Sequence, residues 1–221
     1  MHWPSAAPPR QHPRMAYVLY GDRRSGSAAI ELALDHIGAP FETRPVPLEG
    51  EAQLAAEYRR VNPMGRVPTL LLPDGTVVTE SLAILLTLEG RHPEAGLLPP
   101  GEDPGRARAL RWMALAAGEI YPCVTRSDYP ERFSADPGHA PAIRARAQEM
   151  AREIWGIIER EAAPAPFVLG DRFSLADIYL AVLSRWMGGE AWIPAACPRI
   201  EALAQAVAAR PRLAAAWSRH F

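Results

Sequence analysis

Two adjacent polar residues, Glu80 and Ser81, stand where an apolar strand pattern gives way to a helical one. The N-terminus of a helix offers unpaired N–H groups and a partial positive charge, which together favour a bound carboxylate. The Ser81 hydroxyl can donate to the same anion, and the Glu80 carboxylate can accept from an ammonium group. The pair suits the zwitterionic end of an amino acid, although an ordinary N-cap with an acid in the first turn would have the same sequence.

A second stretch that can bind a ligand is NPMGRVPTL, at residues 62–70. Pro68 lies inside an incipient strand, where it cannot donate a ladder hydrogen bond, so it must occupy a strand start or a special bend. A cis peptide bond between Val67 and Pro68 would turn the backbone N–H and C=O of Val67 outward, available to a ligand. The alternative is an edge-strand proline with no ligand role. The nearby Glu80-Ser81 pair favours the ligand-binding interpretation.

The composition excludes several other chemistries. All 24 cationic residues are arginines, so the chain has no lysine for a Schiff base or a phosphate-binding loop. The net charge of −1 gives no basic footprint for nucleic acid. The six histidines are scattered without metal-ligand spacing, so we expect no metal site. Ser174 and Asp177 precede an apolar helical run and are interpreted as a capping box, not as a catalytic pair.

In the first half of the chain, strand patterns alternate with helical ones. Strands are expected at 16–20, 41–46, 67–72 and 77–79, and helices at 28–37, about 52–60 and about 80–91. The initial strand–helix–strand unit implies a parallel pair, and the turn at residues 73–76 (PDGT) implies an antiparallel hairpin. The resulting order, β-α-β-α-β-β-α, is thioredoxin-like.

In the second half, strand patterns do not return after a linker rich in proline and glycine at residues 92–105. Helices are expected at about 106–121, 142–162, 175–187, 199–209 and 213–218. We therefore predict an α/β domain at residues 15–91, followed by an all-helical domain at residues 106–221.

The remaining sequence features concern the N-terminus and the cellular location of the protein. Residues 1–14 are proline-rich without periodicity, so we expect either a disordered tail or a true start at Met15. Cys123 and Cys197 form no C-x-x-C pair, which favours a reducing, cytoplasmic location. No apolar run approaches the ~20 residues of a membrane span, so no membrane association is expected.

From Tyr17 onward the chain resembles the cytosolic glutathione transferase family. NPMGRVPTL matches the family's asparagine-proline to valine-cis-proline signature, and Glu80-Ser81 matches its glutamate/glutamine–serine pair. The segment GDRFSLAD, at residues 170–177, matches its G-x-x-x-S-x-A-D element, and residues 197–211 look like its last helices.

This resemblance implies that glutathione is a co-substrate and that the protein is a homodimer. The backbone of Val67 would pair with the cysteinyl part of glutathione, and Glu80 and Ser81 would take its γ-glutamyl end. Arg66 would lie near the glycine end, where its fixed cation suits a carboxylate.

The family's reactive group lies between the first strand and the first helix, which here reads YGDRRSGS over residues 20–27. Resemblance to the serine-type classes assigns Ser25 to the glutathione sulfur. Ser27 is the alternative donor, since a serine at the N-cap of the first helix would give the same sequence pattern. The backbone N–H of Gly26 is a third candidate. A hydroxyl donor and a helix N-terminus need to lower a thiol pKa from about 8.5 by only about two units, roughly 3 kcal/mol, to populate thiolate.

The resemblance implies that family members with thiol-transfer activity carry a cysteine in this stretch. Neither Cys123 nor Cys197 lies there, so thiol-transfer chemistry is not expected. We expect instead that the thiolate attacks a small apolar electrophile. The segment RSGS at residues 24–27 keeps only the first half of the arginine–serine–serine–cysteine signature of maleylacetoacetate isomerases, which makes isomerisation an alternative. A further alternative is a non-catalytic binding module. Such modules are usually fused to a synthetase or translation domain, and the chain carries none, so we expect an enzyme.

The electrophile would be held by the helical half. By resemblance, Tyr121 and Trp186 lie where bacterial members place substrate-cleft side chains. Aromatic residues at helical spacing are also typical of a core. Tyr121 can bury its ring and still direct its hydroxyl toward a polar ligand.

Overall fold

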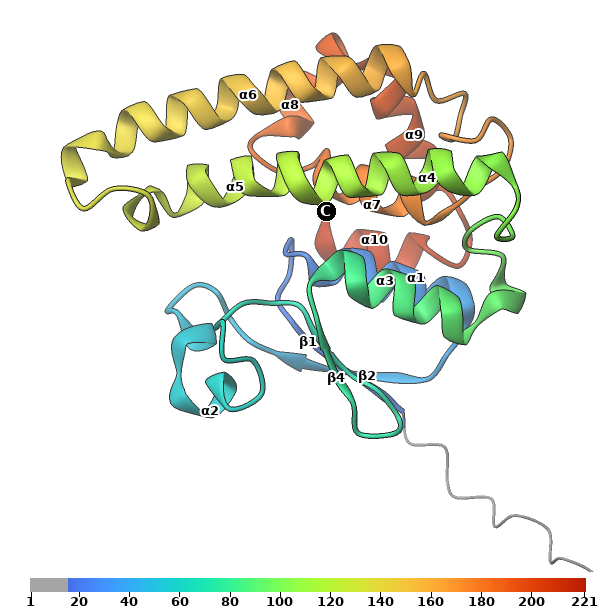
Figure 1. Ribbon diagram of the computed structural model, residues 1–221, viewed down its shortest axis with the longest axis horizontal. Helices are drawn as coiled ribbons and strands as arrows, with labels where there is room; N and C mark the ends of the chain where they lie inside the picture. The colour runs from blue at the N-terminus through green and yellow to red at the C-terminus, as the bar shows by residue number, and fades with distance from the viewer. Residues whose placement is uncertain (1–15) are drawn as a thin grey trace, which may run out of the picture.

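The computed structural model describes residues 16–221, so the tail expected at residues 1–14 lies outside the described residues. Within them, a four-stranded sheet with helices forms the first part of the chain, and helices alone form the second (Figure 1). The predicted fold class, a thioredoxin-like domain followed by an all-helical one, is confirmed. The exact domain boundaries stay a prediction.

The sheet has the strand order β2-β1-β3-β4. Its strands are β1 (Tyr17–Gly21), β2 (Phe41–Pro45), β3 (Thr69–Leu71) and β4 (Val77–Thr79). β1 pairs in parallel with β2 and antiparallel with β3, and β3 pairs antiparallel with β4. The parallel pair and the hairpin are therefore as the sequence predicts.

The helices of the first half are α1 (Ser27–Ile37), α2 (Ala56–Arg59) and α3 (Ser81–Arg91). α1 and α3 lie next to each other between the sheet and the helical part (Figure 1). The helix expected at about 52–60 is wrong as a single element. It divides into a 3₁₀ turn and the short α2, because Ala55 between them has an extended backbone.

The helices of the second half are α4 (Pro104–Leu115), α5 (Tyr121–Asp128), α6 (Ala140–Glu161), α7 (Leu175–Leu183), α8 (Gly189–Ala196), α9 (Pro198–Ala208) and α10 (Ala214–His220). The helix expected to end at Tyr121 instead continues into α5 through a π-helical turn at Ala116–Ile120. The Tyr121 N–H donates to the Ala116 carbonyl, five residues back, and Pro122 then falls in the first turn of α5, where its missing N–H is tolerated.

The helix expected at 175–187 is also too long. α7 ends at Leu183, and left-handed backbones at Met187 and Gly188 separate it from α8, which the sequence does not predict. Pro194 inside α8 obscures its helical pattern. In the part of the chain that the structure describes, no helix is both long and apolar enough to span a membrane.

The buried helix α7 begins at the predicted capping box. One oxygen of the Asp177 carboxylate accepts from the Val168 N–H at 2.8 Å, and the other accepts from the N–H and hydroxyl of Ser174 at 2.7 and 2.9 Å. Burial raises the pKa of Asp177 to about 6, against the effect of these hydrogen bonds, so the group is still ionised at neutral pH. One carboxylate thus serves three buried donors.

Replacing Asp177 should therefore destabilise the fold strongly. In D177A all three donors lose their acceptor, and at 1–3 kcal/mol for each orphaned group we expect a loss of about 4 kcal/mol in the free energy of unfolding. S174A, which removes only the cap hydroxyl, should cost about 1 kcal/mol. Urea unfolding followed by circular dichroism measures both, and equal losses in the two variants would contradict this role of the carboxylate.

Candidate functional site

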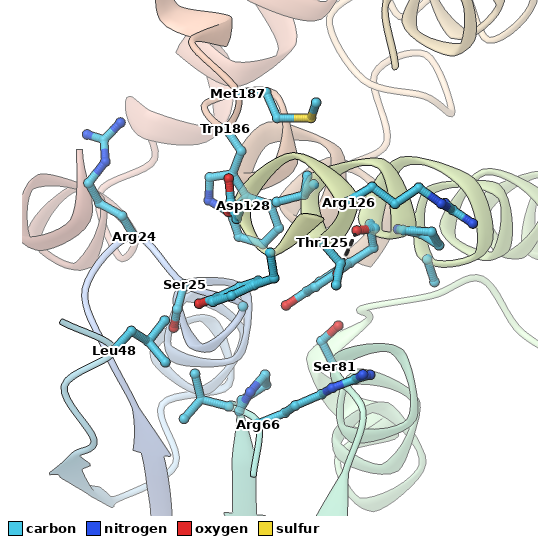
Figure 2. Close-up of a pocket in the computed structure, with 18 of the residues that line it drawn as sticks. Arg24, Ser25, Leu48, Arg66, Ser81, Thr125, Arg126, Asp128, Trp186 and Met187 are labelled. Carbon is cyan, nitrogen blue, oxygen red and sulfur yellow. Dashed lines mark hydrogen bonds between the residues drawn. The ribbon is translucent and has the colours of Figure 1, made fainter. Parts of the chain in front are cut away.

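A cavity of about 630 Å³ lies between the loops of the sheet domain and the helical domain. Ser25, Arg66 and Ser81 line it from one side, and Thr125, Arg126 and Trp186 from the other (Figure 2). All the predicted site residues except Ser27 line this cavity, namely Ser25, Arg66, Val67, Pro68, Glu80, Ser81, Tyr121 and Trp186.

The two serines of the loop after β1 face different spaces. Both hydroxyls donate to the Asp22 carbonyl, at 2.8 Å from Ser25 and 2.9 Å from Ser27, and they lie 2.9 Å apart. Ser25 lines the main cavity, whereas Ser27 lines a second cavity of about 450 Å³. A hydroxyl has a single proton, so Ser25 must turn from Asp22 to donate to a ligand. Ser27 can then keep the Asp22 carbonyl paired.

Gly26, between the two serines, lies against the Tyr121 side chain. A Cβ at this position would lie 2.3 Å from the Tyr121 hydroxyl and 3.0 Å from Cδ of Pro68. Only glycine therefore allows Tyr121 to approach the serine loop so closely. The isomerase signature has a serine at this position, which the present packing would not accept.

The backbone before Pro68 is held in place by hydrogen bonds to the Arg66 carbonyl. The peptide bond between Val67 and Pro68 is cis, which confirms that prediction. The Arg66 carbonyl accepts from the Tyr58 hydroxyl and from the Asn62 amide, both at 2.7 Å. The N–H and C=O of Val67 have no hydrogen-bond partner within residues 16–221. The asparagine of the sequence motif thus fixes the loop that presents the free backbone of Val67.

The Glu80-Ser81 pair begins α3, as predicted. Glu80 has φ 65°, a backbone conformation that costs energy for a residue with a side chain and that concentrates at functional sites. The Ser81 hydroxyl lies 2.9 Å from the hydroxyl of Tyr179 on α7. Burial raises the pKa of Tyr179 to about 12, so it stays protonated and can donate to Ser81. Ser81 is then free to donate its own proton into the cavity.

Tyr121 and Trp186 form one wall of the cavity. Their rings meet edge to face, with centroids 5.1 Å apart and planes at 85°. Burial raises the pKa of the Tyr121 phenol far above its ordinary value, so the hydroxyl stays a hydrogen-bond donor. The indole N–H of Trp186 is buried without a partner among the described residues.

Gln53 is a cavity residue that the sequence does not reveal. The residue is 2% exposed, and its Oε1 atom has no hydrogen-bond donor within the described chain. A buried unpaired acceptor costs about 1–3 kcal/mol, which points to a ligand N–H in the cavity. Gln53 lies in the irregular segment before α2, where no periodicity could have identified it.

Comparison with known proteins agrees with this geometry. A family model of the glutathione S-transferase N-terminal domain matches residues 27–91, and the C-terminal domain model of that family matches residues 141–215. The chain belongs to the glutathione S-transferase family. It is 30% identical to the glutathione S-transferase GstA of Escherichia coli O157:H7 over 191 residues, which cover 85% of this chain and 90% of GstA.

Two further relatives of this glutathione S-transferase chain bear on its site. The maleylacetoacetate isomerase of Pseudomonas aeruginosa is 30% identical over 204 residues, or 88% of this chain and 91% of the isomerase. The crystal structure of a glutathione transferase homologue from Sulfitobacter, with bound glutathione, matches with a TM-score of 0.86. That protein is 29% identical, and the match covers 92% of this chain and 97% of the other.

The buried state of Tyr121 can be tested by titration. Because burial penalises the phenolate, the raised pKa keeps this group protonated at pH values where an ordinary tyrosine ionises, about pH 10. Wild type and Y121F should therefore show the same tyrosinate absorbance up to about that pH. A smaller tyrosinate signal in Y121F within this range would show that Tyr121 ionises and would contradict its role as a permanent donor.

Proposed function

We propose that this family member transfers the thiolate of glutathione to an electrophilic carbon, with Ser25 as the donor that stabilises the sulfur anion. This function is supported above all by the Ser25 hydroxyl, which lines the main cavity next to the N-terminus of α1 and is backed by the Ser27 hydroxyl at 2.9 Å. The unpaired backbone of Val67 lines the same cavity.

The remaining cavity residues suit the other parts of glutathione. The free N–H and C=O of Val67 can pair with the backbone of its cysteinyl part. The Ser81 hydroxyl and the N-terminus of α3 can take the γ-glutamyl carboxylate, and Glu80 can accept from the ammonium group. Arg66 offers two parallel hydrogen bonds to the glycine carboxylate. In the same cavity, Gln53 can offer its unpaired oxygen to a peptide N–H of the ligand.

In the reaction the glutathione thiol gives its proton to solvent water, and a lone pair of the thiolate sulfur forms a bond to the electrophilic carbon. In a substitution the leaving group departs with the electron pair of its bond to that carbon; in an addition the electron pair of the double bond shifts to the neighbouring atom, which then takes a proton from solvent water. A donated hydrogen bond from Ser25 and the positive end of α1 both favour the anion over the thiol. Tyr121, Trp186 and Met187 supply apolar surface for the second substrate.

Thiol transfer is not supported by this cavity. The two cysteines, Cys123 and Cys197, are buried and free, and neither lines the cavity. Burial raises the pKa of both thiols, to about 11 for Cys197, which makes them poor nucleophiles.

From the family resemblance we also propose a homodimer in the cytoplasm.

Removal of the Ser25 hydroxyl should reduce turnover. In S25A the thiolate loses a hydrogen bond to a charged group, about 1.5–3 kcal/mol, so kcat for conjugation of an aryl halide should fall by roughly 10- to 100-fold. The apparent pKa of the bound thiol should rise by about one to two units, while glutathione still raises the melting temperature, because its other contacts remain.

The matched control is S27A, which removes the other hydroxyl of the pair. It should lose only about threefold in kcat, because Ser27 lines the second cavity. If S27A were the slower variant, the thiolate donor would be Ser27. Absence of a thermal shift at millimolar glutathione in the wild type would overturn the binding proposal itself.

A glutathione-dependent cis–trans isomerisation is the second candidate, as in the relatives named maleylacetoacetate isomerase. There the thiolate would add to a double bond and leave again after rotation. One observation favours a carboxylate substrate of this kind: Arg126 and Arg132 line the helical wall of the cavity without an ion pair among residues 16–221. They stack instead on Phe133 and Tyr129, with centroid distances of 5.3 and 3.9 Å.

The two candidates differ in their dependence on charge. If the second substrate is an anion, R126Q should raise its KM by roughly fivefold, or about 1 kcal/mol, as expected for one partly exposed ion pair. The KM for a neutral aryl halide should not change. R111Q, which alters an arginine outside the cavity, is the control. Equal effects of R126Q on charged and neutral substrates would remove the support for an anionic one.

A further inference from the structure

Arg24, the residue before Ser25, has an unfavourable backbone that the helical domain holds in place. Its φ of 56° is in the left-handed region, which is strained for a residue with a side chain. Its backbone N–H donates to Nδ1 of His220 at 3.2 Å, and its guanidinium donates to both oxygens of Glu190 at 3.1 Å. The guanidinium carbon also lies 5.4 Å from the ring centroid of Phe221.

The contact with His220 determines its tautomer. A backbone N–H can only donate, so Nδ1 must accept, and the ring proton lies on Nε2. Nε2 then donates to Glu31 of α1 at 2.8 Å. His220 is 4% exposed and Glu31 is 7% exposed, so the hydrogen bond between them is buried, whereas the bond from the Arg24 N–H to His220 is partly buried.

Glu31 is fixed as an acceptor by its surroundings. Its burial would raise the carboxyl pKa, but hydrogen bonds from His220 and from Arg219, at 2.7 Å, outweigh burial and lower it. Arg219 also pairs with Asp35, one turn further along α1, at 3.3 Å. A continuous path thus runs from α1 through Glu31 and His220 to the N–H of Arg24.

We propose that His220 is a positioning residue for the thiolate donor: its Nδ1 atom holds Arg24 in the left-handed conformation that directs Ser25 into the cavity. This role rests on the proposed function of Ser25. Figure 1 shows α10, with the C-terminus of the chain beside it, next to α1 at the junction of the two domains. The end of the chain therefore contributes to the site without touching the ligand.

Two conservative substitutions distinguish the effect of the hydrogen bond to Arg24 from that of the hydrogen bond to Glu31. The amide oxygen of asparagine is as many bonds from Cβ as Nδ1 of histidine is. H220N can therefore still accept from the Arg24 N–H, but it loses the hydrogen bond to Glu31. The side-chain amide nitrogen of glutamine is as many bonds from Cβ as Nε2 of histidine is. H220Q can therefore keep the hydrogen bond to Glu31, but it leaves the Arg24 N–H unpaired. H220Q should lower kcat for conjugation by about tenfold, with the KM for glutathione nearly unchanged, whereas H220N should lower it by only about threefold.

A second measurement reports on the loop without any turnover. Hydrogen exchange at the Arg24 amide should become about tenfold faster in H220Q and change little in H220N. H139Q, which alters a histidine 63% exposed at the side chain and outside both cavities, is the control for both measurements. Melting temperatures of all the variants identify any that fail to fold.

The opposite ranking, with H220N slower and its Arg24 amide exchanging faster, would show that the bond to Glu31 matters instead and would overturn the positioning role. Equal turnover and equal Arg24 amide exchange in the two variants, with normal turnover in the wild type, would also overturn the positioning role. Failure of the proposed function is a different result, since the wild type would then neither bind glutathione nor turn over the aryl halide. Exchange at Arg24 would still test the contact itself in that case.

Discussion

The site depends on the packing of one helix, α1, whose residues from Ser27 to Leu34 are all buried. On one side α1 packs against α3 of its own domain, and on the other against α7 and α10 of the helical domain. Burial of its leucine and isoleucine side chains contributes about 1.5–3 kcal/mol each, which fixes the helix in one place. The N-terminus of α1, and the serine loop before it, are thereby fixed as well.

Three polar groups at the cavity share a pattern in which each has a hydrogen bond to a second, more buried group. Ser25 has Ser27, Ser81 has Tyr179, and the Arg66 carbonyl has Tyr58 and Asn62. Tyr179 can donate to Ser81, which leaves the Ser81 proton free, and the two donors to the Arg66 carbonyl fix the loop in which Val67 offers its own N–H and C=O. Ser27 can keep the Asp22 carbonyl paired when Ser25 turns toward a ligand. The orientations of Ser81 and Val67 are thereby restricted before a ligand arrives, so less conformational entropy is lost on binding.

Features set by local sequence were predictable. The hairpin follows from its Asp-Gly turn, α1 from its period and Gly38, and the cis bond from Pro68 in its motif. The short α2, the unpredicted α8 and the orphan acceptor of Gln53 were not, because each depends on packing between distant segments. His220 is the clearest example, since its partner Arg24 is 196 positions away in the sequence.

The π-helical turn between α4 and α5 determines which face of α5 meets the cavity. A π turn contains one residue more than an α turn, and one residue corresponds to a rotation of about 100° around the helix axis. α4 can therefore direct Trp112 and Met113 into the core while α5 directs Tyr121 and Thr125 toward the cavity. Loss of a single residue from this turn would redirect the whole substrate-facing side of α5 without altering any residue on it, so insertions and deletions here would change the recognition surface more than point substitutions.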